Sequence, residues 1–239
     1  MTAEIPIEGP PVERAPADAA EPERKALTRD YLETILICVI FVIFSRAFVF
    51  QQSKIPSGSM EDTLLIGDYI MVNRFVYAPT ASGVERALLP VREIRRGDII
   101  VFRQPEHPEL DYIKRVAGLP GERVELRAGY LFVDGQPVEE PWVEERYRRG
   151  GLYDNYPAQL VEPGQYFVLG DHRNSSSDSR DWGQVPRELI KGRALLIWYS
   201  FAEVGNTSPT LSQRMRSWGA KLRYFFTRTR WSRCFSLIR

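Results

Sequence analysis

The sequence has few of the residues on which many enzyme classes depend. Its 239 residues include only two cysteines and two histidines, and Lys plus Arg (32) nearly balance Asp plus Glu (31). Two separated histidines give no recognisable zinc-ligand spacing, so we expect no metal and no cofactor. Cys38 and Cys234 lie in a hydrophobic segment and in a basic tail, which argues against a disulfide between them and against cysteine catalysis. Without a net excess of positive charge, nucleic acid is not an expected partner.

Long hydrophobic runs are also scarce, and the one candidate lies near the N-terminus. Residues 1–30 are rich in Pro, Ala and Glu, and their composition predicts a disordered leader. From Tyr31 to Phe50 the chain is apolar except for a few positions, and its length is about that of a bilayer span. We predict one transmembrane anchor over residues 31–51. A cleavable signal peptide and a buried soluble helix are the alternatives.

The charges on either side of this segment predict its orientation. The basic residues before it outnumber those soon after it: Arg14, Arg24, Lys25 and Arg29 against Lys54 and Arg74. Such a bias places the N-terminus in the cytoplasm. The rest of the chain is then expected on the periplasmic face of the inner membrane.

Between Asp68 and Ser200 the apolar residues form short runs bounded by Gly, Pro or Asp, without helical spacing. Asp134-Gly135 separates two such runs and predicts a tight hairpin turn. We therefore predict a mainly β domain over residues 52–205, with antiparallel sheets forming a small-barrel-like structure. The polar stretch Gly135–Gly164 is expected to leave the core sheets. The runs are Tyr69–Val72, Ile99–Phe102, Tyr112–Val116, Val124–Leu126, Leu131–Val133, Tyr166–Leu169 and Leu195–Tyr199.

The C-terminal segment, residues 206–239, combines basic and aromatic side chains and contains no acidic residue. A solvated disordered tail would explain the charge alone. The interleaved Trp, Tyr and Phe residues favour contact with the headgroup layer of a membrane, since aromatic and basic side chains both suit that layer.

A serine and a lysine are the candidate catalytic residues. Ser59 follows Pro56, which restrains the backbone, and Gly58, which lets a substrate approach closely. Strand alternation places Lys114 on the same face as Tyr112 and Val116, where desolvation would lower its pKa. A shift of roughly two units from about 10.4 costs about 3 kcal/mol, and it would allow the amine to activate a serine hydroxyl. An ordinary loop serine and a surface lysine remain the simpler alternative.

Other serine mechanisms are limited by the same residues. A Ser-His-Asp arrangement needs a histidine base. His107 lies in a turn between two prolines, which leaves His172, beside Asp171, as the rival to Lys114. A Ser-x-x-Lys acylase is excluded at Ser59, because Asp62 stands three residues later.

Three segments together resemble the signature blocks of bacterial type I signal peptidases, the membrane-bound Ser/Lys endopeptidases of the S26 type that remove signal peptides from exported preproteins. The segments are Ile55–Met60, Asp111–Arg115 and Gly170–Arg180, and the resemblance extends from about Arg46 to about Ser200. It implies a membrane-bound enzyme whose substrates are preproteins with small residues at positions −1 and −3, and whose other partner is the lipid bilayer. The better-known members have two anchors, whereas this sequence predicts one.

The resemblance also implies a role for individual residues. Ser59 would be the nucleophile, Lys114 the general base, and Ser57 a hydroxyl donor to the oxyanion hole. Ser176 would orient the lysine amine, and Asp178 and Arg180 would support the site near Arg115. Shallow pockets for small side chains would be shaped by Ile55, Pro56, Met60, Leu64, Ile70, Val101, Tyr112 and Ile113.

The chain departs from the family pattern at Asp62, where proline is common, and at His172, where asparagine is common. The block also continues as Arg173-Asn174-Ser175 where Arg-Asp-Asn is usual. Two other functions fit parts of the pattern. One is a related Ser/Lys processing peptidase with a dedicated substrate, such as a pilin-maturing enzyme. The other is a non-catalytic, membrane-anchored β domain that binds extended peptides by strand addition.

Overall fold

The computed structural model describes residues 20–44, 50–77, 91–202 and 225–238. The chain divides into two compact units, Met1–Ser45 and Arg46–Arg239. Each is described by itself.

The first unit contains helix α1, Ala20–Phe44. It starts inside the leader that composition predicts to be disordered, because Ala20–Leu27 is mostly Ala, Glu, Lys and Leu, which favour helix. Large apolar side chains between Tyr31 and Val42 are exposed on this helix. Of the helices that the described residues form, none is both long enough and apolar enough to cross a membrane. The predicted anchor also ends too late, since Phe50 and Gln51 belong to a β-strand, while residues 45–49 lie outside the described part of the chain.

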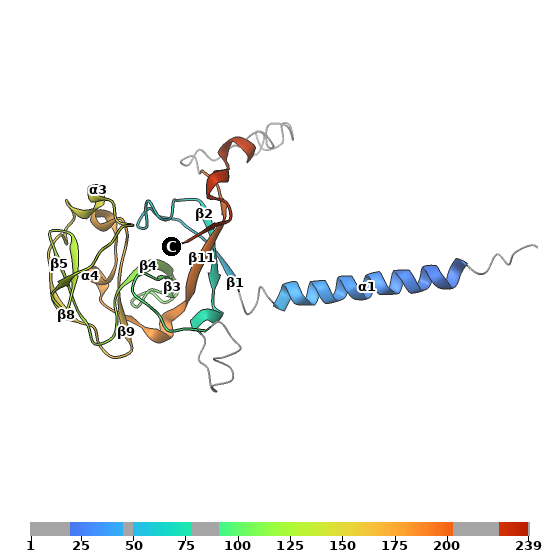
Figure 1. Cartoon of the computed structure of the whole chain (residues 1–239), viewed down its shortest axis with the longest axis horizontal. Coiled ribbons are helices and arrows are strands. Elements are labelled where there is room, and N and C mark those ends of the chain that lie inside the picture. The colour runs from blue at the N-terminus through green and yellow to red at the C-terminus, as the bar shows by residue number, and fades with distance from the viewer. Residues whose placement is uncertain (1–19, 45–49, 78–90, 203–224, 239) are drawn as a thin grey trace, which may run out of the picture. The chain divides into compact units, whose positions relative to one another are not determined.

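The second unit is mainly β, as predicted, and its larger sheet has eight strands (Figure 1). The strand order is β1-β2-β11-β3-β4-β9-β10, every pairing is antiparallel, and β12 pairs with β11. The order runs from one edge strand to another, so the pairings among the described residues do not close the predicted barrel. The strands are β1 (Phe50–Lys54), β2 (Asp68–Asn73), β3 (Ile99–Arg103), β4 (Asp111–Gly118), β9 (Gln165–Leu169), β10 (Val185–Pro186), β11 (Ile190–Ser200) and β12 (Ser236–Leu237).

A smaller antiparallel sheet has the order β7-β6-β5-β8. Its β6–β7 hairpin turns at Asp134 and Gly135, whose φ angles are 51° and 77°. Two successive positive φ angles are those of a type I′ turn, which confirms the hairpin prediction. The strands are β5 (Arg123–Arg127), β6 (Tyr130–Val133), β7 (Gln136–Pro137) and β8 (Tyr156–Leu160).

Short helical segments connect these strands. They are η3 (Phe75–Tyr77), α3 (Glu145–Arg148), η4 (Arg173–Ser175), α4 (Ser179–Trp182), η5 (Arg187–Leu189) and η6 (Trp231–Arg233).

Every predicted apolar run falls inside a strand, but two of the five-residue strands have no apolar signal. Strand β1 reads Phe-Gln-Gln-Ser-Lys, and β8 lies within the polar stretch expected to leave the sheets. Both form by pairing with a neighbour, β1 with β2 and β8 with β5. Their stability therefore comes from non-local hydrogen bonds, which a local apolar pattern does not report.

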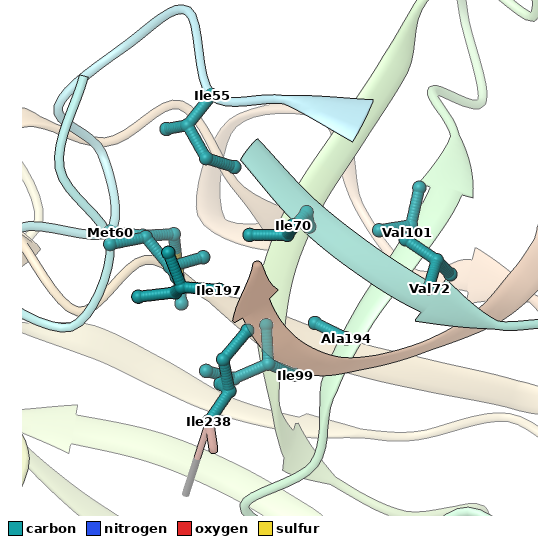
Figure 2. Packing of buried hydrophobic residues seen from close by; sticks show 10 residues of the cluster. Ile55, Met60, Ile70, Val72, Ile99, Val101, Ala194, Ile197 and Ile238 are labelled. Atoms are coloured by element: carbon teal, nitrogen blue, oxygen red, sulfur yellow. The ribbon is translucent and has the colours of Figure 1, made fainter. Parts of the chain in front are cut away.

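One buried cluster supports the loop that carries Ser59 (Figure 2). Ile55 and Met60, which flank Pro56–Ser59 in that loop, are 2% and 0% exposed. The cluster comprises Ile55, Met60, Leu64, Ile70, Val72, Ile99, Val101, Ala194, Ile197 and Ile238. Burial of these two residues fixes where Pro56–Ser59 leaves and rejoins the core.

The end of the predicted tail is part of this β domain. Strand β12 pairs with Leu196 and Ile197 of β11, on the edge opposite β2 and beyond the residues of β11 that pair with β3. Arg233 Nη2 lies 2.7 Å from the buried carboxylate of Asp68, and Ile238 joins the cluster just described. The domain thus extends beyond residue 205, whereas residues 203–224 lie outside the described part of the chain.

The neighbouring residues Leu237 and Ile238 offer a matched test of this packing. Ile238 is 7% exposed and Leu237 is 65% exposed. We expect Ile238→Ala to lower the free energy of unfolding by about 2 kcal/mol, because it leaves a cavity in the core. Leu237→Ala should change it by less than about 0.5 kcal/mol. Urea unfolding of the two variants measures both values, and equal effects would contradict the packing of the C-terminal strand.

Candidate active site

The loop between β1 and β2 presents Ser59 from a fixed backbone. Ile55 forms two main-chain hydrogen bonds at the start of β2. Its N–H donates to Asp68 O at 2.8 Å, and its carbonyl accepts the Gly67 N–H at 3.0 Å. Met60 O accepts the Leu64 N–H at 2.7 Å. The loop therefore has little freedom, although Ser57 at its outer side is exposed and Ser59 is half-buried.

Lys114 meets Ser59 from strand β4. Its Nζ donates to Ser59 Oγ at 2.6 Å, although the two residues are 55 positions apart in the sequence. Once the amine is neutral, the hydroxyl can donate to it instead. The contact therefore has the geometry that proton transfer from serine to lysine requires.

Burial changes the protonation of this lysine. Lys114 is 4% exposed, and desolvation lowers its pKa from 10.5 to about 8. The carboxylates of Asp178 and Asp171 oppose that shift by favouring the ammonium form, and Arg180 adds slightly to it. The aromatic ring of Tyr112, on the same face of β4, lies 5.6 Å from Nζ. The strand alternation read from the sequence thus places the lysine correctly.

The segment after β9, Gly170–Arg180, packs directly on the nucleophile. A β-carbon on Gly170 would lie 2.1 Å from Ser176 Oγ and 2.6 Å from Ser59 O. Neither contact is possible, so the close approach requires glycine. Two residues after Gly170, the His172 N–H donates to Ser59 O at 3.2 Å.

Asp178 and Arg180 hold this segment in place. Asp178 accepts the Gly170 N–H at 3.0 Å and binds Arg180 through both carboxylate oxygens at 2.8 Å. Arg180 also donates to Arg173 O at 2.8 Å. These contacts join the beginning of the Gly170–Arg180 segment to its end.

The partner of Arg115 is Asp171, for which the sequence analysis predicts no supporting role. Arg115 Nε and Nη2 bind the Asp171 carboxylate at 2.9 and 2.7 Å, and both side chains are buried. Thr63, just past the nucleophile, donates to the same carboxylate at 2.6 Å. Asp171 thereby links β4, the nucleophile loop and its own segment. A Gly-Asp pair next to a buried strand end is the only sequence signal that could have indicated this role.

The two other predicted serines are near the site but make different contacts. Ser176 Oγ is buried against Gly170, and the described residues include no hydrogen-bond partner for it. Its predicted contact with the Lys114 amine is therefore not seen in the structure. Ser57 lines the cavity described next.

A cavity of about 530 Å³ opens beside the Ser59–Lys114 pair. Its walls include Pro56, Tyr112 and Ile113 from the set predicted to contact substrate. The other five members of that set, Ile55, Met60, Leu64, Ile70 and Val101, belong to the buried cluster of Figure 2. They lie behind the wall because their side chains are on the inward face of the loop and strands, which residue type alone does not reveal.

His172 also lines the cavity, but its ring is used elsewhere. Nδ1 lies 3.2 Å from Gly58 O and 3.5 Å from Glu61 Oε2, and the ring centre lies 4.0 Å from that of Tyr147. Among the described residues, Ser59 Oγ forms a side-chain hydrogen bond only with Lys114. This geometry favours the lysine as base. Another departure from the family pattern, Asp62, forms an ion pair with Arg146 at 2.5 Å.

Comparisons with known proteins indicate one family. The family model described as signal peptidase, peptidase S26, matches residues 28–199. A signal peptidase I of Pseudomonas aeruginosa is 33% identical, covering 82% of this chain and 81% of the relative. A signal peptidase I of Leptolyngbya laminosa is 34% identical, covering 84% of this chain and 92% of the relative. A crystal structure of a signal peptidase I from Enterococcus faecalis covers 43% of this chain and 97% of that one at 33% identity, but its TM-score of 0.37 is too low for a comparison of folds.

Proposed function

The chain belongs to the signal peptidase family, peptidase S26, and we propose that it is a membrane-bound serine endopeptidase that removes N-terminal signal peptides from exported preproteins. The observation that carries this proposal is the 2.6 Å contact between Lys114 Nζ and Ser59 Oγ. A buried lysine with a lowered pKa next to a serine hydroxyl has an evident use in nucleophilic catalysis. A domain that only bound peptides by adding them as strands at its edge would need neither the serine hydroxyl nor the lysine amine.

In the acylation step, neutral Lys114 removes the proton from Ser59 Oγ as this oxygen bonds to the scissile carbonyl carbon. The oxyanion that forms is stabilised by the Ser59 N–H and the Ser57 hydroxyl. The Lys114 ammonium then gives its proton to the leaving amine, and the C–N bond breaks. The mature protein leaves, and the signal peptide remains as an ester on Ser59.

In the deacylation step, Lys114 accepts a proton from a water molecule that attacks the ester carbon. The second tetrahedral intermediate collapses, the C–O bond to Ser59 breaks, and the proton returns to Oγ. Both steps use one base, so a metal is not needed.

The cavity supports a preference for small residues at positions −1 and −3. Pro56, Tyr112 and Ile113 form its apolar walls, and the buried side chains behind them leave little room to deepen it. Large substrate side chains would be rejected by clash. A dedicated processing peptidase would share the dyad and differ only in these walls.

The dyad predicts a specific pH dependence. Lysine acts as base only when neutral, and the pKa of Lys114 is lowered to about 8. The cleavage rate of a preprotein with a small-x-small site should therefore rise with pH, reach half its maximum near pH 8, and level off above it. A histidine base would give half-maximal rate at about pH 6.5. Initial rates between pH 5.5 and 10 distinguish the two.

Variants test the same assignment. Ser59→Ala and Lys114→Ala should each abolish cleavage, since each removes a reacting group, while far-UV circular dichroism stays unchanged. His172→Asn should keep most of the rate. An active Lys114→Ala protein would show the Ser/Lys assignment to be wrong.

The first unit supports the proposed membrane arrangement. Its exposed apolar side chains between Tyr31 and Val42 support a single-pass anchor that ends before strand β1 begins at Phe50. The basic leader supports a cytoplasmic N-terminus, with the β domain on the periplasmic face of the inner membrane.

Protease added to intact spheroplasts tests this topology. It should digest the β domain and spare an N-terminal tag, because only the leader is expected inside. Lysed cells, in which both parts are accessible, provide the control. A protected β domain in intact spheroplasts would overturn the proposal.

The described end of the tail supports a second contact with the bilayer. Phe225, Phe226, Trp231, Phe235 and Leu237 are exposed there. The rings of Phe226 and Trp231 stack with centres 5.8 Å apart, which holds them together at the surface. The exposed basic side chain of Arg228 accompanies them. Such a surface suits the headgroup layer.

Vesicle binding tests this surface on residues 46–239, the second compact unit. Replacing Trp231 and Phe235 by Ser should weaken binding to anionic vesicles by about tenfold, because apolar area and two interfacial aromatic rings are lost. Leu152→Ser is the matched control, since Leu152 is 95% exposed elsewhere on the domain. Equal binding by the wild type, the Trp231 and Phe235 double variant and Leu152→Ser would contradict the proposed membrane contact.

A further inference from the structure

The imidazole of His172 contacts the peptide group that precedes the nucleophile. Its Nδ1 lies 3.2 Å from Gly58 O and 3.5 Å from Glu61 Oε2. Both neighbours are hydrogen-bond acceptors. Nδ1 must therefore carry a hydrogen, in the neutral ring as well as in the charged one. The donation to Gly58 O does not depend on whether Nε2 is protonated.

The carbonyl of Gly58 receives a second donor. The Glu61 N–H donates to the same oxygen at 3.0 Å. Across this peptide group, the Ser59 N–H has no hydrogen-bond acceptor among the described residues. One end of the peptide group is thus saturated by donors, while the other end is free to donate.

This N–H is the main-chain donor that would stabilise the oxyanion. Hydrogen bonds accepted by an amide carbonyl polarise the group and strengthen donation by its N–H. They also fix the plane of the peptide, and hence the direction in which the N–H points. A donor on Gly58 O therefore acts on the oxyanion hole through a single peptide bond.

The ring of His172 is held where it can do this. It packs on Tyr147 with ring centres 4.0 Å apart. The His172 main-chain N–H binds Ser59 O at 3.2 Å, so the residue contacts the carbonyls on both sides of the Ser59 N–H. The carboxylate of Glu61 lies over Gly58, since a β-carbon there would be 3.1 Å from Oε2.

We propose that His172 is a positioning residue for transition-state stabilisation: its Nδ1–H orients and polarises the Gly58–Ser59 peptide so that the Ser59 N–H binds the oxyanion. The inference rests on the proposed peptidase function and deepens it. It assigns the ring no part in proton transfer, which remains with Lys114.

Two substitutions separate the hydrogen bond from the packing of the ring. His172→Phe keeps an aromatic ring against Tyr147 but removes the donor. His172→Asn removes the ring but places an amide N–H one bond from Cγ, as Nδ1 is. The matched control is His107→Phe, because His107 is exposed in a turn away from the cavity.

Cleavage kinetics of the full-length protein in detergent give the first readout. We expect His172→Phe to lower kcat by about tenfold with KM unchanged, less than the loss caused by removing an oxyanion donor outright. His172→Asn and His107→Phe should stay within about twofold of wild type, a spread typical of neutral changes. The rise of the rate near pH 8 should persist in all four proteins, since Lys114 is untouched.

A labelling experiment reads the hydrogen bond without activity. Gly58-Ser59 is the only Gly-Ser dipeptide in the sequence. Protein labelled with carbonyl-¹³C glycine and ¹⁵N serine therefore gives one carbonyl-to-amide NMR correlation, from this peptide group. In His172→Phe the carbonyl signal should move upfield, as expected for a lost donor, while in His172→Asn it should stay near the wild-type position.

The outcomes distinguish the proposed peptidase function from the proposed positioning role of His172. Wild-type protein that leaves the preprotein intact overturns the peptidase function, and the NMR signal still reports whether His172 binds Gly58 O. An unchanged kcat or an unchanged carbonyl shift in His172→Phe overturns the positioning role. So does a loss of kcat in His172→Asn equal to that in His172→Phe, because it would mean that the ring and not its N–H is needed.

Discussion

Burial of the Lys114 amine is the constraint on which the site depends. Desolvation lowers its pKa from 10.5 to about 8, so the folded chain binds this proton less tightly than the unfolded chain does. Below about pH 8 the buried charge therefore lowers the stability of the fold, and this penalty disappears as the pH rises from about 8 to about 10.5. The fold therefore gives up stability at neutral pH in order to hold a base whose pKa suits catalysis.

The carboxylates near the lysine keep this penalty limited. Asp178 and Asp171 both favour the ammonium form, but neither is free to pair with it. Asp178 is bound by Arg180, and Asp171 by Arg115 and Thr63. Because each carboxylate has its own arginine, the pair attracts the ammonium only weakly. An unpaired carboxylate beside Lys114 would raise its pKa and keep it charged.

The sequence predicted most of the strands, and it indicated two residues, Ser59 and Lys114, that the structure brings into contact. Short runs bounded by Gly, Pro and Asp mark buried strands, and alternation along β4 correctly placed Lys114 on an inward face. Features that depend on distant partners were missed. The polar strand β1 requires β2, and the C-terminal segment requires Asp68, whose carboxylate binds Arg233 across 165 positions. Composition describes that segment as a basic tail because its partner is far away in the chain.

The site shows the same limit at the level of single residues. A family pattern names Ile55, Met60, Leu64, Ile70 and Val101, but it does not tell whether each side chain lines a cavity or supports it from behind. That distinction depends on the path of the loop, and the loop is fixed by Gly170, whose missing side chain allows Ser176 and Ser59 to approach. Asp171 is the converse case. Its sequence position is conspicuous, but its role depends on Arg115 and Thr63, which only the fold brings to it.

His172, one of the departures from the family pattern, lies away from the proton-transfer path. Lys114 reaches Ser59 Oγ from β4, whereas His172 contacts the main chain on either side of the Ser59 N–H. In the proposed mechanism, proton transfer and oxyanion stabilisation are thus supported by different elements that meet only at Ser59. A substitution at His172 can then adjust the donor strength of one peptide group without moving the base. Lys114 has no such freedom, because its burial, its pKa and its contact with Ser59 all depend on the same side-chain position.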